Sequence, residues 1–551
     1  MKRFIVSLLT FLFVFTILGG TAAGIFLYRK YFPSKELADQ SEWFGASGNE
    51  VAIIWNQEQD ESAAAKGRQI DGEVYLPLTW VNENINQKFY WDAAGRQLIY
   101  TLPESIVYAG EDTLGSSGRP LFVEQDGEVW LMTGLIQTYT DVRMEIFADG
   151  DVKRIFVDSD WNPEQVAEVK KDTKVRVRGG IKSEILTEAA LGDQIVVLET
   201  MENWSRVRTS DGFIGYVENK RLGGSRERTL ISTFAAPEYT SISLEKPVSL
   251  VWHQVTSQQA NKAMEELMAD AKGVNVIAPT WFMLTDNAGN YESLANQEYV
   301  DQAHAMGLQV WAVLDNFNKG ENVQSEVLFA DTNARKKLIA SLMEDVKNYK
   351  LDGINLDIES IKPEAGPHYV QFIRELSVDC RKNGIVLSAD SYVPSAYTSF
   401  YNRAEQGQVI DYVIIMGYDE HYAGGEAGSV ASLGYVKKGI EDTLKEVPKE
   451  KVIIGIPFYT RLWKEDGFST AMGIEKAKAW VEENGMELYW QEELGQYYGE
   501  LNTEDGLCQL WMEEETSIGK KMELIRDYDL AGVACWKLGL EPADIWDIVN
   551  P

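Results

Sequence analysis

One short segment of the chain carries carboxyl groups at a spacing that suits acid catalysis. Residues 351–359 read Leu-Asp-Gly-Ile-Asn-Leu-Asp-Ile-Glu. In an extended strand alternate side chains point to opposite faces, so the polar side chains here share one face: Asn355, Asp357 and Glu359. Burying carboxyl groups is unfavourable unless they are paired, hydrogen-bonded or protonated. The pattern therefore indicates a functional site, with a structural polar cluster as the alternative.

The spacing of the two acids suggests a particular chemistry. Asp357 and Glu359 are two residues apart, or about 6.6 Å along a strand. Neighbouring carboxyl groups in a shared buried site have separated pKa values, so one acid stays protonated near neutral pH. Such an acid can protonate the leaving oxygen when a glycosidic bond is cleaved. The residues alone thus indicate a hydrolase with a carboxyl pair.

Eight apolar segments are expected to form the strands that position this pair. They alternate with amphipathic segments of helical length. The expected strands are 249–255, 274–284, 308–315, 353–359, 386–393, 412–419, 452–459 and 532–537. Eight strands alternating with helices over roughly 300 residues are typical of an α/β protein with a (β/α)8 or TIM barrel. Glu359 would lie at the C-terminal end of strand four, where barrel enzymes place catalytic residues. The long, aromatic-rich connection between strands seven and eight predicts an insertion.

The N-terminal segment predicts a membrane helix. The 25 residues from Phe4 to Tyr28 carry no charge, and about 20 apolar residues span a bilayer. We expect residues 1–30 to be an uncleaved signal anchor, with the rest of the chain outside the cell membrane. The alternative is secretion after cleavage near the small residues Thr21 to Ala23.

The remainder of the chain divides by composition and strand pattern. Residues 31–165 are expected to form a linker and a small α+β stalk domain, in which 73–100 predict a strand, a short helix and a hairpin. Residues 166–225 contain short strands with Gly- and Asp-containing turns, which indicate a small β-barrel. Residues 226–242 are expected to be a linker, and 243–551 the large barrel.

Charge and cysteine content exclude several classes of function. The 551 residues include 52 Lys+Arg and 85 Asp+Glu, a formal net charge of -33. Such a chain would be repelled by DNA or RNA, so we expect no nucleic-acid partner. Three scattered cysteines do not form a disulfide framework, and no metal-ligand spacing or phosphate loop is present. No metal and no cofactor is therefore expected.

The strand-four segment resembles the Asp-Gly-x-x-x-Asp-x-Glu signature of glycoside hydrolase family 18, the chitinase-type hydrolases. The resemblance covers roughly residues 245–551, and three further segments agree with it: Met416-Gly417-Tyr418-Asp419, Gly455-Ile456-Pro457-Phe458-Tyr459-Thr460-Arg461 and Gly532-Val533-Ala534-Cys535-Trp536. Residues 166–225 are similar to bacterial Src-homology-3-like domains, and part of 31–165 resembles the stalk domain of copper amine oxidases. The combination looks like the cortex-lytic branch of wall-directed hydrolases.

The resemblance to family 18 implies a substrate-assisted, retaining mechanism. Glu359 would be the general acid and later the base, and Asp357 would orient the substrate's 2-acetamido group. Tyr418 would hydrogen-bond the acetamido carbonyl, and Trp536 would form the apolar floor of the subsite. Further substrate-binding residues would be Asp352, Asn355, Met416, Asp419, Tyr459 and Arg461; Tyr392 also follows a strand end.

One position departs from the family pattern. Asn355 stands where many members have a further aspartate, and an amide cannot share a proton with Asp357 as a carboxyl group can. The departure is expected to weaken the coupling between the acids or to change the pH optimum.

These observations lead to one principal hypothesis and two alternatives. The chain is expected to be a membrane-anchored extracellular hydrolase that cleaves β-1,4-linked N-acetylglucosamine-containing glycan, either peptidoglycan or a chitin-like polymer. Its expected partners are that polysaccharide, the cell wall and the membrane. The alternatives are a non-catalytic, lectin-like protein on the same barrel and a structural wall scaffold. The Src-homology-3-like segment would bind wall peptide or glycan, or act as a spacer.

Overall fold

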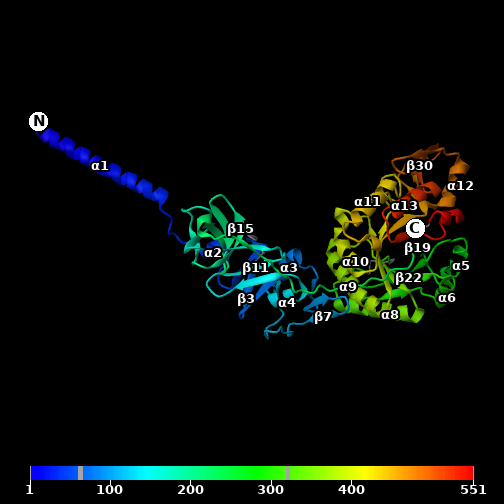
Figure 1. Cartoon of the computed structure of the whole chain (residues 1–551). Helices are drawn as coiled ribbons and strands as arrows, with labels where there is room; N and C mark the ends of the chain where they lie inside the picture. The colour runs from blue at the N-terminus through cyan, green and yellow to red at the C-terminus, as the bar shows by residue number, and fades with distance from the viewer. Residues whose placement is uncertain (1, 60–65, 318–322, 505, 550–551) are drawn as a thin grey trace. The chain divides into compact units, whose positions relative to one another are not determined.

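The computed structural model describes residues 2–59, 66–317, 323–504 and 506–549 (Figure 1). They group into two compact units. The first contains Met1–Phe89 and Ala109–Ala236, and the second contains Tyr90–Tyr108 and Pro237–Pro551. Residues 90–108, which the sequence places in the stalk, therefore belong with the barrel.

The chain begins with one long helix, α1 (Lys2–Tyr31). At 1.5 Å per residue its 30 residues extend for about 45 Å, which exceeds the thickness of a bilayer core. Its apolar stretch Leu9–Phe26 is long and apolar enough to cross a membrane, and a signal sequence near the N-terminus would have the same properties.

The first unit contains a mixed sheet in the order β10-β11-β1-β3-β4-β9-β8, with β2 paired to β1. Its strands are β1 (Glu50–Trp55), β2 (Glu58–Gln59), β3 (Lys66–Ile70), β4 (Glu73–Pro77), β8 (Phe122–Gln125), β9 (Glu128–Met132), β10 (Arg143–Phe147) and β11 (Lys153–Asp158). The helices of this unit after α1 are α2 (Gln40–Phe44), α3 (Leu78–Asn84) and α4 (Thr133–Tyr139). The predicted strand and short helix at the start of residues 73–100 are confirmed as β4 and α3.

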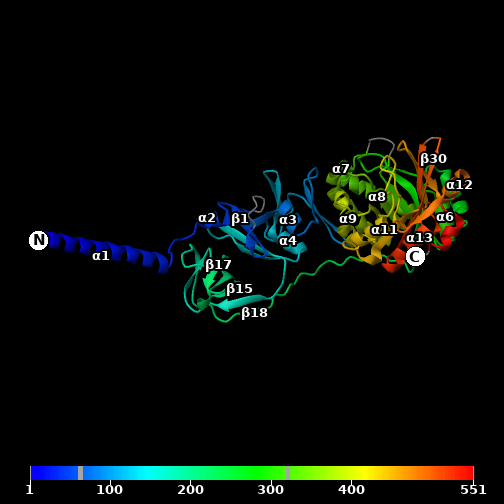
Figure 2. The same ribbon diagram turned by 90° about the horizontal axis from the view of Figure 1, so that it is seen from above.

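A second, seven-stranded sheet follows in the same unit, in the order β14-β13-β17-β16-β15-β12-β18 (Figure 2). Its strands are β12 (Glu164–Glu168), β13 (Thr173–Arg176), β14 (Ile185–Ala189), β15 (Gln194–Thr200), β16 (Trp204–Arg208), β17 (Ile214–Glu218) and β18 (Arg226–Arg228). Small apolar side chains such as Val175, Val207 and Val217 form its separate core. The predicted small β-domain at 166–225 thus corresponds to these strands.

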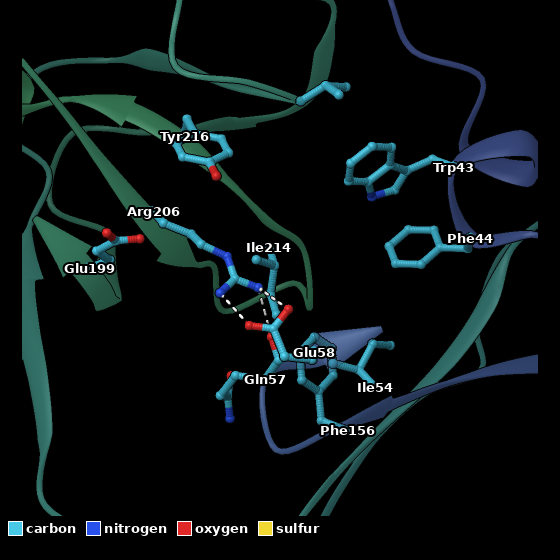
Figure 3. Close-up of a pocket in the computed structure, with 11 residues that line it drawn as sticks. Trp43, Phe44, Ile54, Gln57, Glu58, Phe156, Glu199, Arg206, Ile214 and Tyr216 are labelled. Atoms are coloured by element: carbon cyan, nitrogen blue, oxygen red, sulfur yellow. Dashed lines mark hydrogen bonds and ion pairs between the residues drawn. The ribbon is translucent and has the colours of Figure 1, made fainter. Parts of the chain in front are cut away.

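The two sheets of the first unit enclose a pocket of about 430 Å³. Figure 3 shows Trp43 and Phe44 on one side and Tyr216 and Arg206 on the other. The Arg206 guanidinium donates hydrogen bonds of 2.6 and 3.0 Å to the two carboxylate oxygens of Glu58. This bidentate pair links β16 to β2.

The hairpin predicted after α3 belongs to the second unit. It forms a three-stranded sheet of β5 (Phe89–Asp92), β6 (Gln97–Thr101) and β7 (Ile106–Ala109). The Tyr90 hydroxyl lies 2.7 Å from His368 Nδ1 and 3.4 Å from Arg335 Nη1. These contacts attach the sheet to the helices α8 (Thr332–Tyr349) and α9 (Gly366–Asn383) of the barrel.

Eight parallel strands close into the predicted barrel. Their order is β19-β32-β26-β25-β24-β23-β22-β20, and β20 pairs with β19 to complete the ring. The strands are β19 (Val248–His253), β20 (Val276–Leu284), β22 (Gln309–Asp315), β23 (Gly353–Asp357), β24 (Val386–Tyr392), β25 (Tyr412–Met416), β26 (Val452–Pro457) and β32 (Gly532–Trp536). A short strand β21 (Tyr291–Ser293) extends β20. Every strand expected from the sequence is present, and the TIM-barrel prediction is confirmed.

Helices cover the outside of this barrel (Figure 1). They are α5 (Met264–Leu267), α6 (Gln297–Ala305), α7 (Ser325–Leu328), α8, α9, α10 (Arg403–Val409), α11 (Leu433–Thr443) and α13 (Glu515–Asp527). Ile354, Leu356 and Ile358 pack in the large core that contains these helices. A separate cluster, including Trp252 and Trp311, fills the barrel interior. The predicted separation of strand four into an apolar outer face and a polar inner face is thus correct.

The expected insertion lies between β26 and β32. It is a five-stranded antiparallel sheet, β28-β27-β31-β30-β29, with one helix, α12 (Ile474–Asn484). Its strands are β27 (Tyr459–Lys464), β28 (Ser469–Gly473), β29 (Leu488–Gln491), β30 (Gln496–Thr503) and β31 (Gly506–Met512). Since β27 begins two residues after β26 ends, the insertion starts at the C-terminal rim of the barrel.

Candidate active site

Glu359 lies just beyond the C-terminal end of β23 and is half-buried. Its backbone is held by Asn316: the Glu359 amide donates to Asn316 Oδ1 over 3.0 Å, and Asn316 Nδ2 donates to the Glu359 carbonyl over 2.8 Å. The Tyr392 hydroxyl donates a 2.6 Å hydrogen bond to Glu359 Oε2 and accepts one from the Ser360 amide. The backbone of Glu359 is therefore held by the residue after β22, and its carboxyl group by the last residue of β24.

Burial raises the pKa of Glu359, and the charge of Asp419 adds to the rise. The hydrogen bonds from Tyr392 and with Asp357 oppose it. Because the net direction is upward, the Glu359 carboxyl keeps its proton to higher pH than an exposed glutamate. This is the property that a general acid needs.

Asp357 lies deeper in the barrel, with 8% of its surface exposed. Burial raises its pKa well above the ordinary value, and the charges of Asp390, Glu359 and Asp315 raise it further. Its Oδ1 atom is buried and has no hydrogen-bond partner in the structure. A buried acceptor of this kind is available to a donor on a bound molecule.

Three aspartates stand side by side on adjacent strands. Asp315 of β22 pairs in register with Asp357 of β23. Leu356 pairs with Ala389, which places the next residues, Asp357 and Asp390, beside one another. Burial raises the pKa of Asp315 to about 6, and burial also raises the pKa of Asp390 well above its usual range. Carboxyl groups in such a row cannot all be ionised near neutral pH.

Asn355 occupies the layer below the row and is fully buried. Its Oδ1 accepts a 2.9 Å hydrogen bond from Trp252 Nε1, and its Nδ2 donates to Ser388 Oγ over 3.1 Å and to Asp390 Oδ1 over 2.9 Å. All the polar atoms of the amide therefore have protein partners, and Asn355 is placed to orient its neighbours rather than to touch a ligand.

Aromatic side chains border the carboxyl groups. Trp536, at the end of β32, is half-buried, and its ring lies 5.9 Å from the ring of Trp252. Tyr418, which follows β25, packs edge-on against Trp252 at 6.5 Å and against Tyr459 at 6.4 Å. Half-buried aromatic faces beside acids are suited to the apolar face of a sugar ring.

Asp419 lies at the same rim and is exposed. The Tyr459 hydroxyl donates to Asp419 Oδ1 over 2.6 Å, and Arg461 Nη2 lies 3.7 Å from the same oxygen. The structure thus brings these three predicted residues together. The Nε atom of Arg461 is buried and has no hydrogen-bond partner among the residues that the structure describes, so it is available as a donor.

One predicted site residue is placed elsewhere. Asp352 precedes β23, so the whole strand, about 16 Å long, separates it from Glu359. Its Oδ2 atom lies 2.8 Å from His304 Nε2 and accepts a 2.8 Å bond from the Val310 amide. This corrects the expectation that Asp352 binds substrate. Met416, at the end of β25, pairs in register with Tyr392 and is only 6% exposed. Since Tyr412 and Ile414 of the same strand lie in the interior cluster, Met416 also faces the barrel interior, at the level of Tyr392.

Asp390 and Asp315 are not among the residues predicted from the sequence, although one signal was present. On strand five, Ser388 and Asp390 alternate with the apolar Leu387 and Ala389, as the polar residues of strand four do with their apolar neighbours. Among the residues that the structure describes, no group of three or more metal-ligating side chains is placed to hold an ion.

Comparison with known proteins agrees with this geometry. Residues 320–541 match the model of glycosyl hydrolases family 18. The chain carries a family 18 glycosyl hydrolase domain. Residues 171–223 match the bacterial SH3 domain, which corresponds to the small β-domain of the first unit. Neither match covers the segment expected to resemble the copper amine oxidase stalk.

Among curated proteins, the family 18 domain is similar to proteins of Bacillus subtilis. The chain is 28% identical over 291 residues to the uncharacterized glycosylase YvbX of Bacillus subtilis, covering 50% of this chain and 84% of that protein. It is 26% identical over 236 residues to the cortical fragment-lytic enzyme of Bacillus subtilis, covering 41% of this chain. The match spans about half, 55%, of that enzyme's length.

Solved structures share the fold. The spore cortex-lytic enzyme SleL of Bacillus cereus has a TM-score of 0.51 and 20% identity, covering 59% of this chain and 78% of that one. A chitinase of Chromobacterium violaceum has a TM-score of 0.51 and 21% identity, covering 55% and 98%. These likenesses establish the barrel architecture.

Proposed function

We propose that the chain is a membrane-anchored extracellular hydrolase that cleaves β-1,4-linked N-acetylglucosamine-containing glycan. The observation that carries the proposal is the position of Glu359, a half-buried acid held by Tyr392 at the barrel rim, with Asp357 buried beside it. The family 18 domain supports glycosidic-bond cleavage as the reaction class.

The mechanism follows from the two acids and the resemblance to family 18. Glu359 donates its proton to the glycosidic oxygen as the bond between that oxygen and the anomeric carbon breaks. The carbonyl oxygen of the substrate's 2-acetamido group attacks the anomeric carbon from the other side. This attack forms an oxazolinium ring. Water then attacks the anomeric carbon and opens that ring, while Glu359, now a carboxylate, takes a proton from the water. The anomeric configuration is therefore retained.

Asp357 would hold the acetamido group in place during this attack. Its unpartnered, buried Oδ1 can accept a hydrogen bond from the acetamido N–H. The bond orients the carbonyl oxygen and stabilises the positive charge that develops on the ring. Tyr418 would hydrogen-bond the carbonyl oxygen, while Trp536 stacks beneath the sugar.

The cell wall is the substrate source that we propose. The SH3 match and the similarity to cortical fragment-lytic enzymes support a wall glycan, and helix α1 would keep the enzyme at the outer face of the membrane. Asp419, Tyr459 and Arg461 would contact polar groups of the neighbouring sugar. Chitin-like polymers contain the same reacting unit.

A comparison of matched substrates tests the proposal. The purified chain is incubated with N-acetylglucosamine oligomers, with solubilised peptidoglycan and with glucose oligomers of equal length, and the products are identified by mass spectrometry. We expect cleavage of the acetamido-containing glycans only, because the hydroxyl analogue lacks the nucleophile. Efficient cleavage of plain glucosides would contradict substrate assistance, and binding without cleavage would favour the lectin-like alternative.

A further inference from the structure

Asp390 is a buried acid for which the proposed reaction so far has no use. It lies on β24, is 3% exposed, and stands beside Asp357 on the neighbouring strand. Adjacent strands of a sheet are about 4.8 Å apart, so the two side chains lie in one layer of the barrel interior. The charge of Asp390 is the first among those that raise the pKa of Asp357. Both are too deeply buried to be ionised together at low cost.

Within the described part of the chain, the charges that act on Asp390 or respond to it come from acids and phenols. Its electrostatic neighbours are Asp357, Glu359, Tyr418 and Tyr369. Its side chain accepts a hydrogen bond from the neutral amide of Asn355. A buried acid surrounded by other acids and neutral phenols is most stable when it shares one proton with a neighbouring acid.

Asn355 distinguishes the two members of the pair. Its Nδ2 donates to Asp390 Oδ1 over 2.9 Å, whereas among the described residues Asp357 Oδ1 has no partner. The hydrogen bond between the Asp357 and Glu359 side chains raises the pKa of Asp357. A donated hydrogen bond favours the carboxylate form, so in the resting site Asp390 ionises first and the shared proton lies on Asp357. The amide at position 355 therefore acts on the pair although it cannot itself carry the proton.

We propose that Asp390 is a positioning residue that shares one proton with Asp357 and supplies, from strand β24, the carboxyl group that Asn355 lacks. When the acetamido N–H of a substrate reaches Asp357, the proton moves from Asp357 to Asp390. Asp357 becomes the carboxylate that accepts the N–H, and the total charge of the pair does not change. The inference rests on the proposed function, because it assigns a role in that same site.

The test is the pH dependence of kcat/KM in the variant Asp390→Asn. If the pair shares a proton, either of the two carboxyl groups can lose the first proton in the wild type. In the variant only Asp357 can lose it. The acidic limb of the pH profile of kcat/KM then moves to higher pH in the variant. The shift is at least about 0.3 pH unit, because equal sharing between two groups doubles the first ionisation constant of the wild type. If Asp390 were instead a permanent carboxylate that only repels Asp357, its removal would move the limb to lower pH.

Two further variants make the result specific. Ser388→Ala removes the other acceptor of the Asn355 amide without changing a charge, and its acidic limb is expected to match the wild type. The exchange variant Asn355→Asp/Asp390→Asn places the second carboxyl group on strand four. The acidic limb of its pH profile is expected to return toward the wild-type position. An unmoved or downward limb in Asp390→Asn, or an equal shift in Ser388→Ala, overturns the inference.

A direct titration keeps the inference testable if the variant does not fold. In wild-type protein labelled with 13C at the aspartate carboxyl groups, NMR should show Asp357 and Asp390 responding together in two steps. Independent single-step titration of Asp390 would overturn proton sharing. A wild type that cleaves no acetamido-containing glycan would instead refute the proposed function, and the titration would still decide the sharing.

Discussion

The Tyr392 hydroxyl donates a 2.6 Å hydrogen bond to Glu359 Oε2. This contact joins the ends of strands four and five and stabilises the ionised form of the acid, so it opposes the upward effect of burial on the Glu359 pKa. The protonation state of the acid thus depends on one phenol that can be removed without changing the backbone.

Replacing Tyr392 with Phe should move the basic limb of the pH–rate profile to higher pH. Loss of the donor destabilises the carboxylate, which raises the pKa of Glu359 further, so the acid keeps its proton over a wider range. The measurement is kcat/KM against pH. Tyr397→Phe is the matched control, because Tyr397 lies in the same connection and is 89% exposed. A basic limb that moves downward would contradict this role of Tyr392.

Replacing Trp536 with Ala should weaken substrate binding more than it slows the chemical step. Stacking on an aromatic face contributes about 0.5–1.5 kcal/mol, which corresponds to a rise of about 2- to 13-fold in KM. Steady-state kinetics with a soluble oligosaccharide measure it. Trp43→Ala, in the first unit, is the control and should leave KM unchanged. An unchanged KM in Trp536→Ala would remove this residue from the subsite.

Replacing Arg335 with Met should strongly destabilise the barrel. Arg335 and Glu375 form a fully buried ion pair between α8 and α9, with Nε 2.9 Å from Oε2. Removing one partner leaves the other charge buried and unpaired, which costs about 3–5 kcal/mol. Urea denaturation measures the loss. Lys337→Met, at an exposed position of the same helix, should change the free energy of unfolding by less than about 0.5 kcal/mol. Equal stability of the two variants would refute the importance of the pair.

The architecture of the barrel could be predicted because alternation is a local property of the sequence. Strand four separates polar from apolar residues every second position, so the inward direction of Asn355 and Asp357 follows from the strand assignment. The short helix α3 and the hairpin after it were predictable for the same reason. The assignment of residues 90–108 to the barrel was not, because it depends on contacts such as Tyr90 with His368, which are distant in sequence.

The site itself could be predicted only in part. Asp390 shows the same alternation as Asp357, but its position beside Asp357 depends on the register between two strands, which sequence spacing does not determine. Asp352 illustrates the opposite error. It is close to Glu359 in the chain, yet a strand is straight, so a residue before the strand lies at the other end of the barrel.

The central claim is that Glu359 is the acid of a glycan hydrolase, and Glu359→Gln tests it most directly. The backbone at this position is held by Asn316 independently of the carboxyl group, so the variant should fold and still bind glycan. We predict that hydrolysis of N-acetylglucosamine oligomers or solubilised peptidoglycan falls by about 10²- to 10⁴-fold. The control Glu364→Gln, at an exposed position a few residues later, should keep wild-type activity. Equal rates in wild type and Glu359→Gln, or no activity in either on any acetamido-containing glycan, would contradict the account.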